Sequence, residues 1–432
     1  MSGTAAVHAA IGALIGLTSG YGVQRIADTA AGSQIFGTAP MTTAVIAALV
    51  AITAVSLFSW GRVRYCVVYG IGLAGLAIVG AVSALPAPDE WNELPVALGV
   101  ALGLLIVPAL LTTAVQVWFF GGLVAAGVLG YQWENLLGGD HFRYHDYPGS
   151  LDPPGRMWQL VVAVALGAGL LLAMRWRRAD HVDVDLSGRI VAFGAAIALT
   201  SGLLARLSTE TGRLPVASVL LVLAVFAAGV RWLPQGSATT LAAMTAAAAV
   251  LVIEPGLDRE PSIFTLVAGV AAVIGGLAVG LRQRRAALAV GVCAGAALIG
   301  ALSFVSDTDW VRIAAGAVLL FAAAMAGAAT LPLEPSLLAG WTVLPVLASL
   351  TARELPTSND GAVPSWVGVT PDTDHYTMWA GTVHGFVELT STTPPAFEPR
   401  PDLIVPGLIA AALCTACAIW LTRRDSTVES TG

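Results

Sequence analysis

The sequence has little charge. Only 11% of its 432 residues are charged and 56% are hydrophobic, whereas a soluble domain carries about 25% charged residues. Lysine is absent, so all 21 basic residues are Arg, which indicates a high-GC coding bias rather than a function. Long apolar runs with few charges are what a bilayer core demands. We therefore expect an integral membrane protein whose main partner is the lipid bilayer.

Motifs for ATP use and for common hydrolases are also missing. There is no GxxxxGK[ST] loop, no GxSxG elbow and no HExxH motif. No Asp, Glu or Arg falls deep within an expected span, although ion-coupled carriers usually keep a buried acid or His. His8, near the start of the first span, is better placed at the cytoplasmic interface. The sequence thus disfavours an ATP-driven machine and a proton antiporter with a membrane carboxylate.

Cysteine is scarce, and its positions exclude exterior disulfides. The four residues Cys66, Cys293, Cys414 and Cys417 all lie in apolar stretches. The last two form a C-x-x-C, which at membrane depth indicates a small packing face rather than a redox or metal site. The N-terminus lacks the basic region of a signal peptide, so the first apolar stretch is expected to remain as a span.

Apolar runs of bilayer length predict an all-α polytopic membrane protein with about 14 transmembrane helices (12–14). The expected spans are 5–23, 41–60, 65–85, 95–112, 115–133, 157–174, 190–205, 214–230, 237–253, 263–281, 286–304, 312–330, 335–352 and 402–422. The pair 95–112 and 115–133 forms one uncharged run broken only by Pro108 and the threonines at 112 and 113. Two full crossings and a re-entrant hairpin both remain open there.

Arginine clusters set the orientation. Arg-rich loops stay on the cytoplasmic side of a membrane. Threading fourteen spans puts every cluster on one side, so both termini are expected to be cytoplasmic, in the cytoplasmic (cell) membrane. The clusters are Arg62 and Arg64; Arg175, Arg177 and Arg178; Arg282, Arg284 and Arg285; and Arg423 and Arg424.

An internal repeat indicates duplication. Residues 12–20 read GALIGLTSG and residues 194–202 read GAAIALTSG, with seven of nine positions identical at an offset of 182 residues. Both copies are expected to run from inside to outside, so the repeat is parallel. Parallel six-helix units are a transporter architecture, although Gly/Ala/Leu-rich helices can also match by composition alone.

The expected organisation follows from the repeat. Residues 1–174 form the first six-helix unit and residues 190–330 the second. The complete division is 1–174, a cytoplasmic Arg-rich loop at 175–189, 190–330, an additional span at 331–352, an extracytoplasmic loop or cap at 353–401, and the last span with a short cytoplasmic tail at 402–432.

The first long exterior segment, 134–156, contains closely spaced histidines. His141 and His145 lie in the pattern D-H-x-x-x-H-D. Two His residues four apart on a helix face one side and can share a metal. No cofactor is evident from the sequence, and a divalent metal on His141 and His145 is the one cofactor that it raises. The simpler interpretation is a solvated polar loop.

The second exterior segment, 353–401, holds the catalytic candidates. They are Arg353, Asp374, His375 and His384. A neutral His beside a carboxylate suits general acid–base catalysis, and Arg binds phosphate through its planar fork. The segment is long enough for a lid or a small cap.

Aromatic and basic side chains near the outer face are the expected substrate-binding residues. Trp366, Tyr376 and Trp379 lie mid-loop, where a membrane-interface belt does not account for them. Arg25 and Arg206 follow the two repeat copies at outer helix ends, where a phosphate head group or simple snorkelling to the interface would explain them.

These observations favour a transporter or flippase-like protein for a lipid-linked or amphipathic envelope precursor, and they leave an enzyme open. The alternative is a membrane-embedded glycosyltransferase, ligase or polymerase acting at the outer face on polyprenyl-phosphate-linked glycans. The chain resembles, in outline, ligases of the O-antigen type, which have many spans and one long late exterior loop with Arg and His; no extended motif matches. A third possibility is a non-catalytic scaffold of an envelope-assembly complex. A polyprenyl-phosphate lipid or glycan is the candidate ligand; no nucleic-acid partner is expected, and partner proteins stay unknown.

Overall fold

The computed structural model describes eleven stretches of the chain. Nine of them are helical, and two are the strands of one hairpin. The described residues are 9–20 without 11 and 18, six positions between 71 and 78 (71, 72, 74, 75, 77 and 78), 113–138, 188–210, 215–233, 235–253, 263–304, 308–331, 367–371, 376–380 and 404–429.

Eight helices of the structure coincide with expected spans. They are α5 (Thr113–Gly138), α7 (Gly188–Glu210), α8 (Pro215–Trp232), α9 (Gln235–Val252), α10 (Ile263–Gln283), α11 (Ala286–Ser303), α12 (Asp309–Thr330) and α14 (Ile404–Glu429). The described residues of 9–20 and 71–78 are helical as well. The expectation of a helical protein is therefore confirmed for this part of the chain. The expected spans 41–60, 95–112, 157–174 and 335–352 lie outside it, and fourteen spans stays a prediction.

Helix ends follow local chemistry. Pro215 occupies the first position of α8, where its missing N–H would have no partner in any case. α10 ends in a tight turn in which Arg284 has a left-handed backbone, φ 45°. The Arg284 N–H donates to the carbonyl of Gly280 at 3.0 Å, a C-terminal cap of the left-handed type. Only Arg284 and Arg285 separate α10 from α11.

The outer helices expose apolar faces, as membrane helices do. By length and composition α10, α11 and α12 can each cross a bilayer. On α10 the side chains of Phe264 and Val267 are 71% and 59% exposed, and on α11 Leu302 is 70% exposed. Water would penalise such surfaces heavily. The protein is therefore a multi-pass membrane protein, in agreement with its composition.

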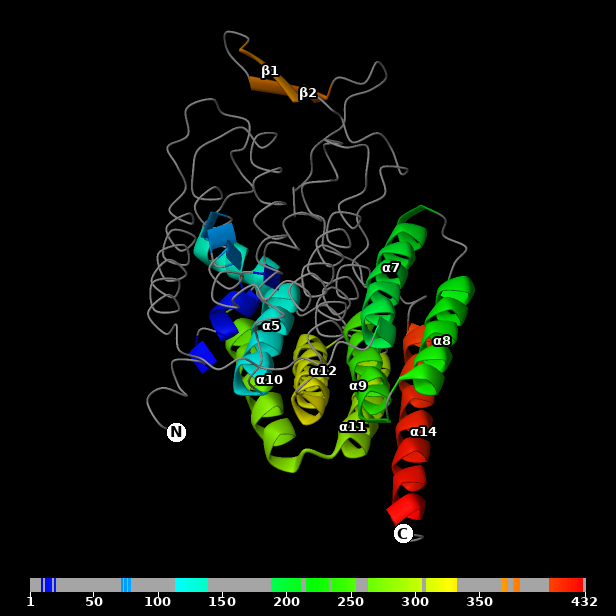
Figure 1. Cartoon of the computed structure of the whole chain (residues 1–432). Helices are drawn as coiled ribbons and strands as arrows, with labels where there is room; N and C mark the ends of the chain where they lie inside the picture. Colours follow the sequence, from blue (N-terminus) through cyan, green and yellow to red (C-terminus); the bar gives the residue numbers. More distant parts are fainter. Residues whose placement is uncertain are drawn as a thin grey trace.

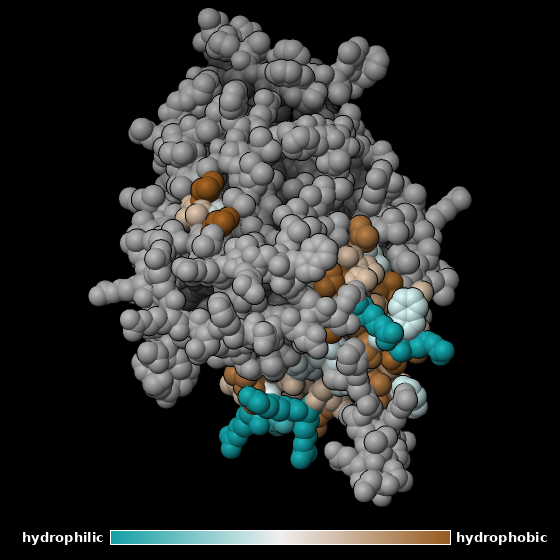
Figure 2. All heavy atoms as spheres, viewed as in Figure 1, coloured by the Kyte–Doolittle hydropathy of each residue, from teal (hydrophilic) through white to brown (hydrophobic). Residues whose placement is uncertain are grey.

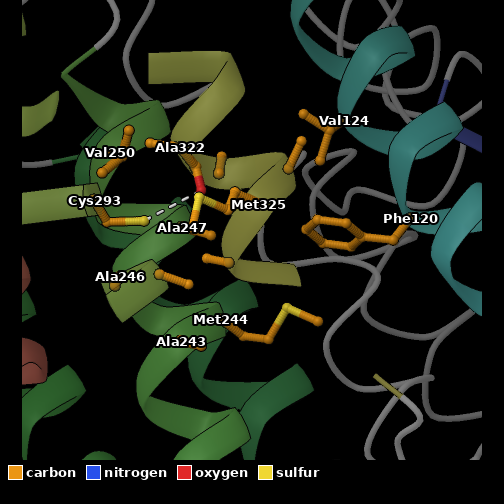
Figure 3. Packing of buried hydrophobic residues seen from close by; sticks show 14 of the residues in the cluster. Phe120, Val124, Ala243, Met244, Ala246, Ala247, Val250, Cys293, Ala322 and Met325 are labelled. Atoms are coloured by element: carbon orange, nitrogen blue, oxygen red, sulfur yellow. Dashed lines mark hydrogen bonds between the residues drawn. The ribbon is translucent and has the colours of Figure 1, made fainter. Parts of the chain in front are cut away.

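The centre of the bundle is built from α9 and α12, which are rich in alanine. α12 contacts α5, α9, α10 and α11, and α9 contacts α8, α11, α12 and α14. Every described side chain of α9 from residue 240 to residue 251 is buried. Figure 3 shows Met325 of α12 near Phe120 of α5, with the α9 alanines and Met244 close by. Because alanine and glycine bring backbones close, the core depends on backbone proximity more than on bulky side chains.

The first helical segment, 9–20, packs against α5 through its glycines. A Cβ added to Gly12 would lie 2.7 Å from the carbonyl oxygen of Val115. One added to Gly20 would lie 2.9 Å from the carbonyl oxygen of Leu123, and Gly16 between them is tighter still against the α5 backbone at Phe119. The contacts advance together along both helices, so the two run parallel. This is the direction expected of a first and a fifth span.

α10 and α12 form a second parallel pair. Gly276 lies against the backbone at Phe321, and a Cβ added to Gly280 would lie 2.5 Å from the carbonyl oxygen of Met325. Two glycines four residues apart thus again allow close contact between backbones. A tenth and a twelfth span should also run in the same direction.

The hairpin and the arginine turn lie at opposite ends of the molecule. Strand β1 (Val367–Pro371) pairs antiparallel with β2 (Tyr376–Ala380). Figure 1 shows the hairpin at the top of the view and the turn between α10 and α11 at the bottom, near the C-terminal end of α14. The segment expected outside and a cluster expected inside are therefore separated by the length of the bundle.

Candidate functional site

The hairpin is the described part of the exterior segment 353–401. Its register pairs Tyr376 with Pro371 and Trp379 with Gly368. By sequence, only residues 372–375 connect the two strands, and they include Asp374 and His375. Two substrate-binding candidates thus belong to one strand, directly after two catalytic candidates in the chain. The sequence predicted a lid or cap at this point without predicting strands.

Most other candidates fall on parts of the chain that the structure does not describe. Arg206 belongs to α7, of which only the backbone is described at that position. That the candidate site residues lie close to one another therefore stays a prediction. The candidates outside the described residues are Arg25, His141, His145, Arg353, Trp366, Asp374, His375 and His384.

The two repeat copies bury corresponding positions. Each residue of 12–17 has the same burial class as its counterpart in 194–199: the same positions are buried, half-buried and exposed. At the last position Leu17 is 41% exposed and Leu199 is 55% exposed. Both copies therefore turn the same side of the helix toward the protein.

Few polar side chains lie inside the described bundle, and nearly all have partners. Ser303 donates its hydroxyl to the Gly300 carbonyl at 2.6 Å, a bond within its own helix. Gln116 on α5 is almost fully buried and has an interaction partner. Among the buried side-chain oxygens and nitrogens of the described residues, only Ser19 Oγ has no hydrogen bond. Ser19 belongs to the first repeat copy and is 1% exposed.

The three cysteines that the structure describes pack in or against the core of the bundle. Cys293 on α11 donates its thiol to the Ala322 carbonyl of α12 at 3.4 Å, which Figure 3 shows as a dashed line. Cys414 is 2% exposed, Cys417 is half-buried, and both are free thiols. Within the described residues no group of three His, Cys, Asp or Glu side chains could hold a metal. Cys414 and Cys417 thus pack against the core of the bundle.

Exposed arginines gather at the turn between α10 and α11. Arg282, Arg284 and Arg285 surround the turn between α10 and α11, and all three are exposed. Arg231 lies at the end of α8 beside Trp232, whose side chain is 66% exposed. Figure 2 shows hydrophilic side chains in two places, at the lower edge of the view and at its right side, each next to apolar ones. The sequence analysis used the three arginines of the turn only to orient the chain, and it did not identify the surface that they form.

No protein-family model matches the sequence, and no curated protein matches it significantly.

Proposed function

We propose that this protein is a flippase-like transporter of a lipid-linked or amphipathic envelope precursor in the cytoplasmic membrane. The observation that supports it is the repeat, because two segments 182 residues apart bury corresponding positions. Duplicated halves related by an axis along the membrane normal are a recurring transporter plan, in which one half moves against the other around a central site.

The glycine contacts supply a physical means for such motion. The face formed by Gly12, Gly16 and Gly20 lies directly on the α5 backbone. A helix face without side chains presents few obstacles to the small sliding displacements of packed helices that shear motions use. In this proposal the first segment moves relative to α5 while the outward apolar faces stay in lipid.

An amphipathic cargo fits the exterior of the bundle. Exposed apolar side chains on α10, α11 and α14 can remain in contact with the tail of a lipid carrier throughout transport. Only the polar head group then has to cross between helices. A wholly water-soluble cargo would gain nothing from such a surface.

The test is a flipping assay with purified protein in liposomes. A fluorescent short-chain polyprenyl-phosphate sugar is added during reconstitution, and dithionite in the outer solution then bleaches the probe in the outer leaflet only. Active protein should raise the bleached fraction from about half toward completeness. Enlarging the glycine face by Gly16→Leu should abolish the increase, whereas Ala10→Leu, on the exposed side of the same segment, should not. Liposomes that bleach equally with and without the protein would refute transport of this probe.

The second candidate is a membrane-embedded glycosyltransferase, ligase or polymerase at the outer face, acting on polyprenyl-phosphate-linked glycans. The hairpin favours it, since a short connection between paired strands contains Asp374 and His375 next to Tyr376. Replacing Asp374, His375 and His384 with Ala should abolish glycan transfer by an enzyme at unchanged protein level. A flippase should tolerate these changes. Cellular lipid analysis adds an independent test: accumulation of the intermediate on the outer leaflet in cells lacking the protein indicates the enzyme.

A further inference from the structure

The turn between α10 and α11 concentrates positive charge at the edge of an apolar surface. Arg282, Arg284 and Arg285 are exposed, and the left-handed backbone at Arg284 makes the connection tight. Between residues 261 and 306 the sequence contains no Asp or Glu. The charge of the three guanidinium groups is therefore not offset by a carboxylate of either adjoining helix.

After this turn in the chain, the outward face of α11 has a gap between its side chains. A Cβ added to Gly291 or Gly295 would meet nothing within 4 Å. Large apolar side chains lie above and below the gap, since Leu288 and Leu298 are 45% and 57% exposed. From Leu288 onward the steps along this face alternate between three and four residues, so the positions form one stripe along α11, and the arginine turn lies just before the N-terminal end of that helix. The stripe consists of Leu288, Gly291, Gly295, Leu298 and Leu302.

The gap lies at the depth of a lipid acyl chain. At 1.5 Å per residue, Gly291 and Gly295 are roughly 9 and 15 Å from Arg285 along the helix axis. Half of a bilayer core of about 30 Å is about 15 Å. A lipid whose phosphate contacts the arginines would therefore place an acyl chain over the glycines without leaving its leaflet.

Charge favours a lipid over a second copy of the chain as the molecule that covers this face of α11. Two copies related by a two-fold axis along the membrane normal would bring their α11 helices together in parallel. That arrangement would place two identical arginine turns at the same end, where like charges repel. A phosphate group is instead complementary to the turn, and Arg is the side chain best shaped to bind it.

We propose that the α10–α11 turn and the outward face of α11 bind one anionic phospholipid, with its phosphate on the arginines and one acyl chain in the gap at Gly291 and Gly295. The site is separate from the transport proposal and does not depend on it. It assigns to the arginine turn a specific ligand in addition to its role in orientation. Anionic lipids are typical of the cytoplasmic leaflet, which is the side predicted for this turn.

The experiment is native mass spectrometry of the full-length protein, purified in detergent and titrated with phosphatidylglycerol or phosphatidylcholine. One variant removes the charge (Arg282→Gln, Arg284→Gln and Arg285→Gln together), and another fills the gap (Gly291→Leu with Gly295→Leu). Arg231→Gln is the matched control for charge, and Ala271→Leu, at an exposed position of α10, is the control for bulk. Arg285→Gln alone serves where the triple variant fails to insert.

Wild-type protein should retain one phosphatidylglycerol more tightly than phosphatidylcholine. At about 1 kcal/mol per arginine, loss of the three charges should weaken this binding on the order of a hundredfold, and Arg285→Gln about fivefold. The gap-filling variant should also lose the retained lipid, both controls should keep it, and glycerol phosphate without acyl chains should not compete. Equal retention by all variants would overturn the proposal. So would a gap-filling variant that changes the monomer–dimer ratio and keeps its lipid, because the face would then bind a second copy.

Discussion

Gly16 is the position where a single methyl group should be most damaging. A Cβ there would collide with the backbone oxygen of Phe119 and lie 3.0 Å from the backbone nitrogen of Leu123. Both obstacles are main-chain atoms, so no side-chain rotation can relieve them. The first segment and α5 would have to separate along their whole contact. We therefore expect Gly16→Ala to destabilise the bundle although alanine is the better helix former.

A matched substitution separates the free-energy cost of the backbone collision from the gain in helix propensity. Overpacking of a core costs about 1–3 kcal/mol, and backbone obstacles put Gly16→Ala near the upper end, at about 3 kcal/mol. Replacing Gly by Ala also raises helix propensity by about 1 kcal/mol. Gly295→Ala brings the same gain with nothing within 4 Å of the new methyl group. The propensity term cancels between the two variants, so their difference in unfolding free energy should be about 3 kcal/mol, or roughly a hundredfold in the unfolding equilibrium.

The assay is reversible unfolding in mixed micelles with a rising fraction of SDS, followed by circular dichroism. Gly16→Ala should shift the midpoint to lower SDS, and Gly295→Ala should leave it unchanged or raise it. Coincident curves for the two variants would refute the close approach of the first segment to α5, and with it the parallel packing of this pair.

Three further predictions use the same preparation. Gly280→Ala should lower the unfolding free energy by about 2 kcal/mol, because the added Cβ would lie 2.5 Å from the Met325 carbonyl oxygen. Gly275→Ala is the control and should be neutral, since its methyl group meets only the Phe321 ring at 3.5 Å. Equal effects of the two substitutions in SDS unfolding would contradict the α10–α12 contact. Ser19→Ala should raise the thermal midpoint, since removal of an unpartnered buried hydroxyl relieves about 1 kcal/mol or more; a lower midpoint would mean that the hydroxyl is bonded. N-ethylmaleimide in detergent should label half-buried Cys417 before the buried Cys293 and Cys414. Peptide mass spectrometry can measure the order of labelling. Simultaneous labelling of these three cysteines would contradict the packing of α11 and α14.

The sequence predicts helix positions well because hydropathy depends on local composition. The span expected at 263–281 is α10, Ile263–Gln283, and that at 286–304 is α11, Ala286–Ser303. The larger differences occur where a helix continues past its apolar run. α5 extends to Gly138 and α14 to Glu429, although apolar character ends near residues 133 and 422. Polar residues beyond the bilayer can still form backbone hydrogen bonds along the helix, so charge marks the end of a span rather than of a helix.

Helix partners could not be predicted, because glycine pairs look alike in sequence. Gly276 and Gly280 of α10 pack against α12. Gly291 and Gly295 of α11 have the same spacing, but a Cβ added to either would meet nothing within 4 Å. A glycine face permits close approach without specifying which backbone approaches it. The hairpin was missed for a different reason: the strand Val367–Pro371 is short, and its alternation is easily taken for a polar loop. The candidate site therefore remains a sequence prediction except for the strand that contains Tyr376 and Trp379.

The pairing of the first segment with α5 also has a consequence for synthesis of the chain. Gly12 packs on Val115, so its partner leaves the ribosome about 100 residues later. At about 5–20 residues per second, the newly inserted first helix waits roughly 5–20 s before it can dock. During that interval its glycine face is exposed to lipid or to the insertion machinery. A chain arrested before residue 113 would keep this face unpaired, which gives membrane quality control a structural feature by which to recognise an unfinished product.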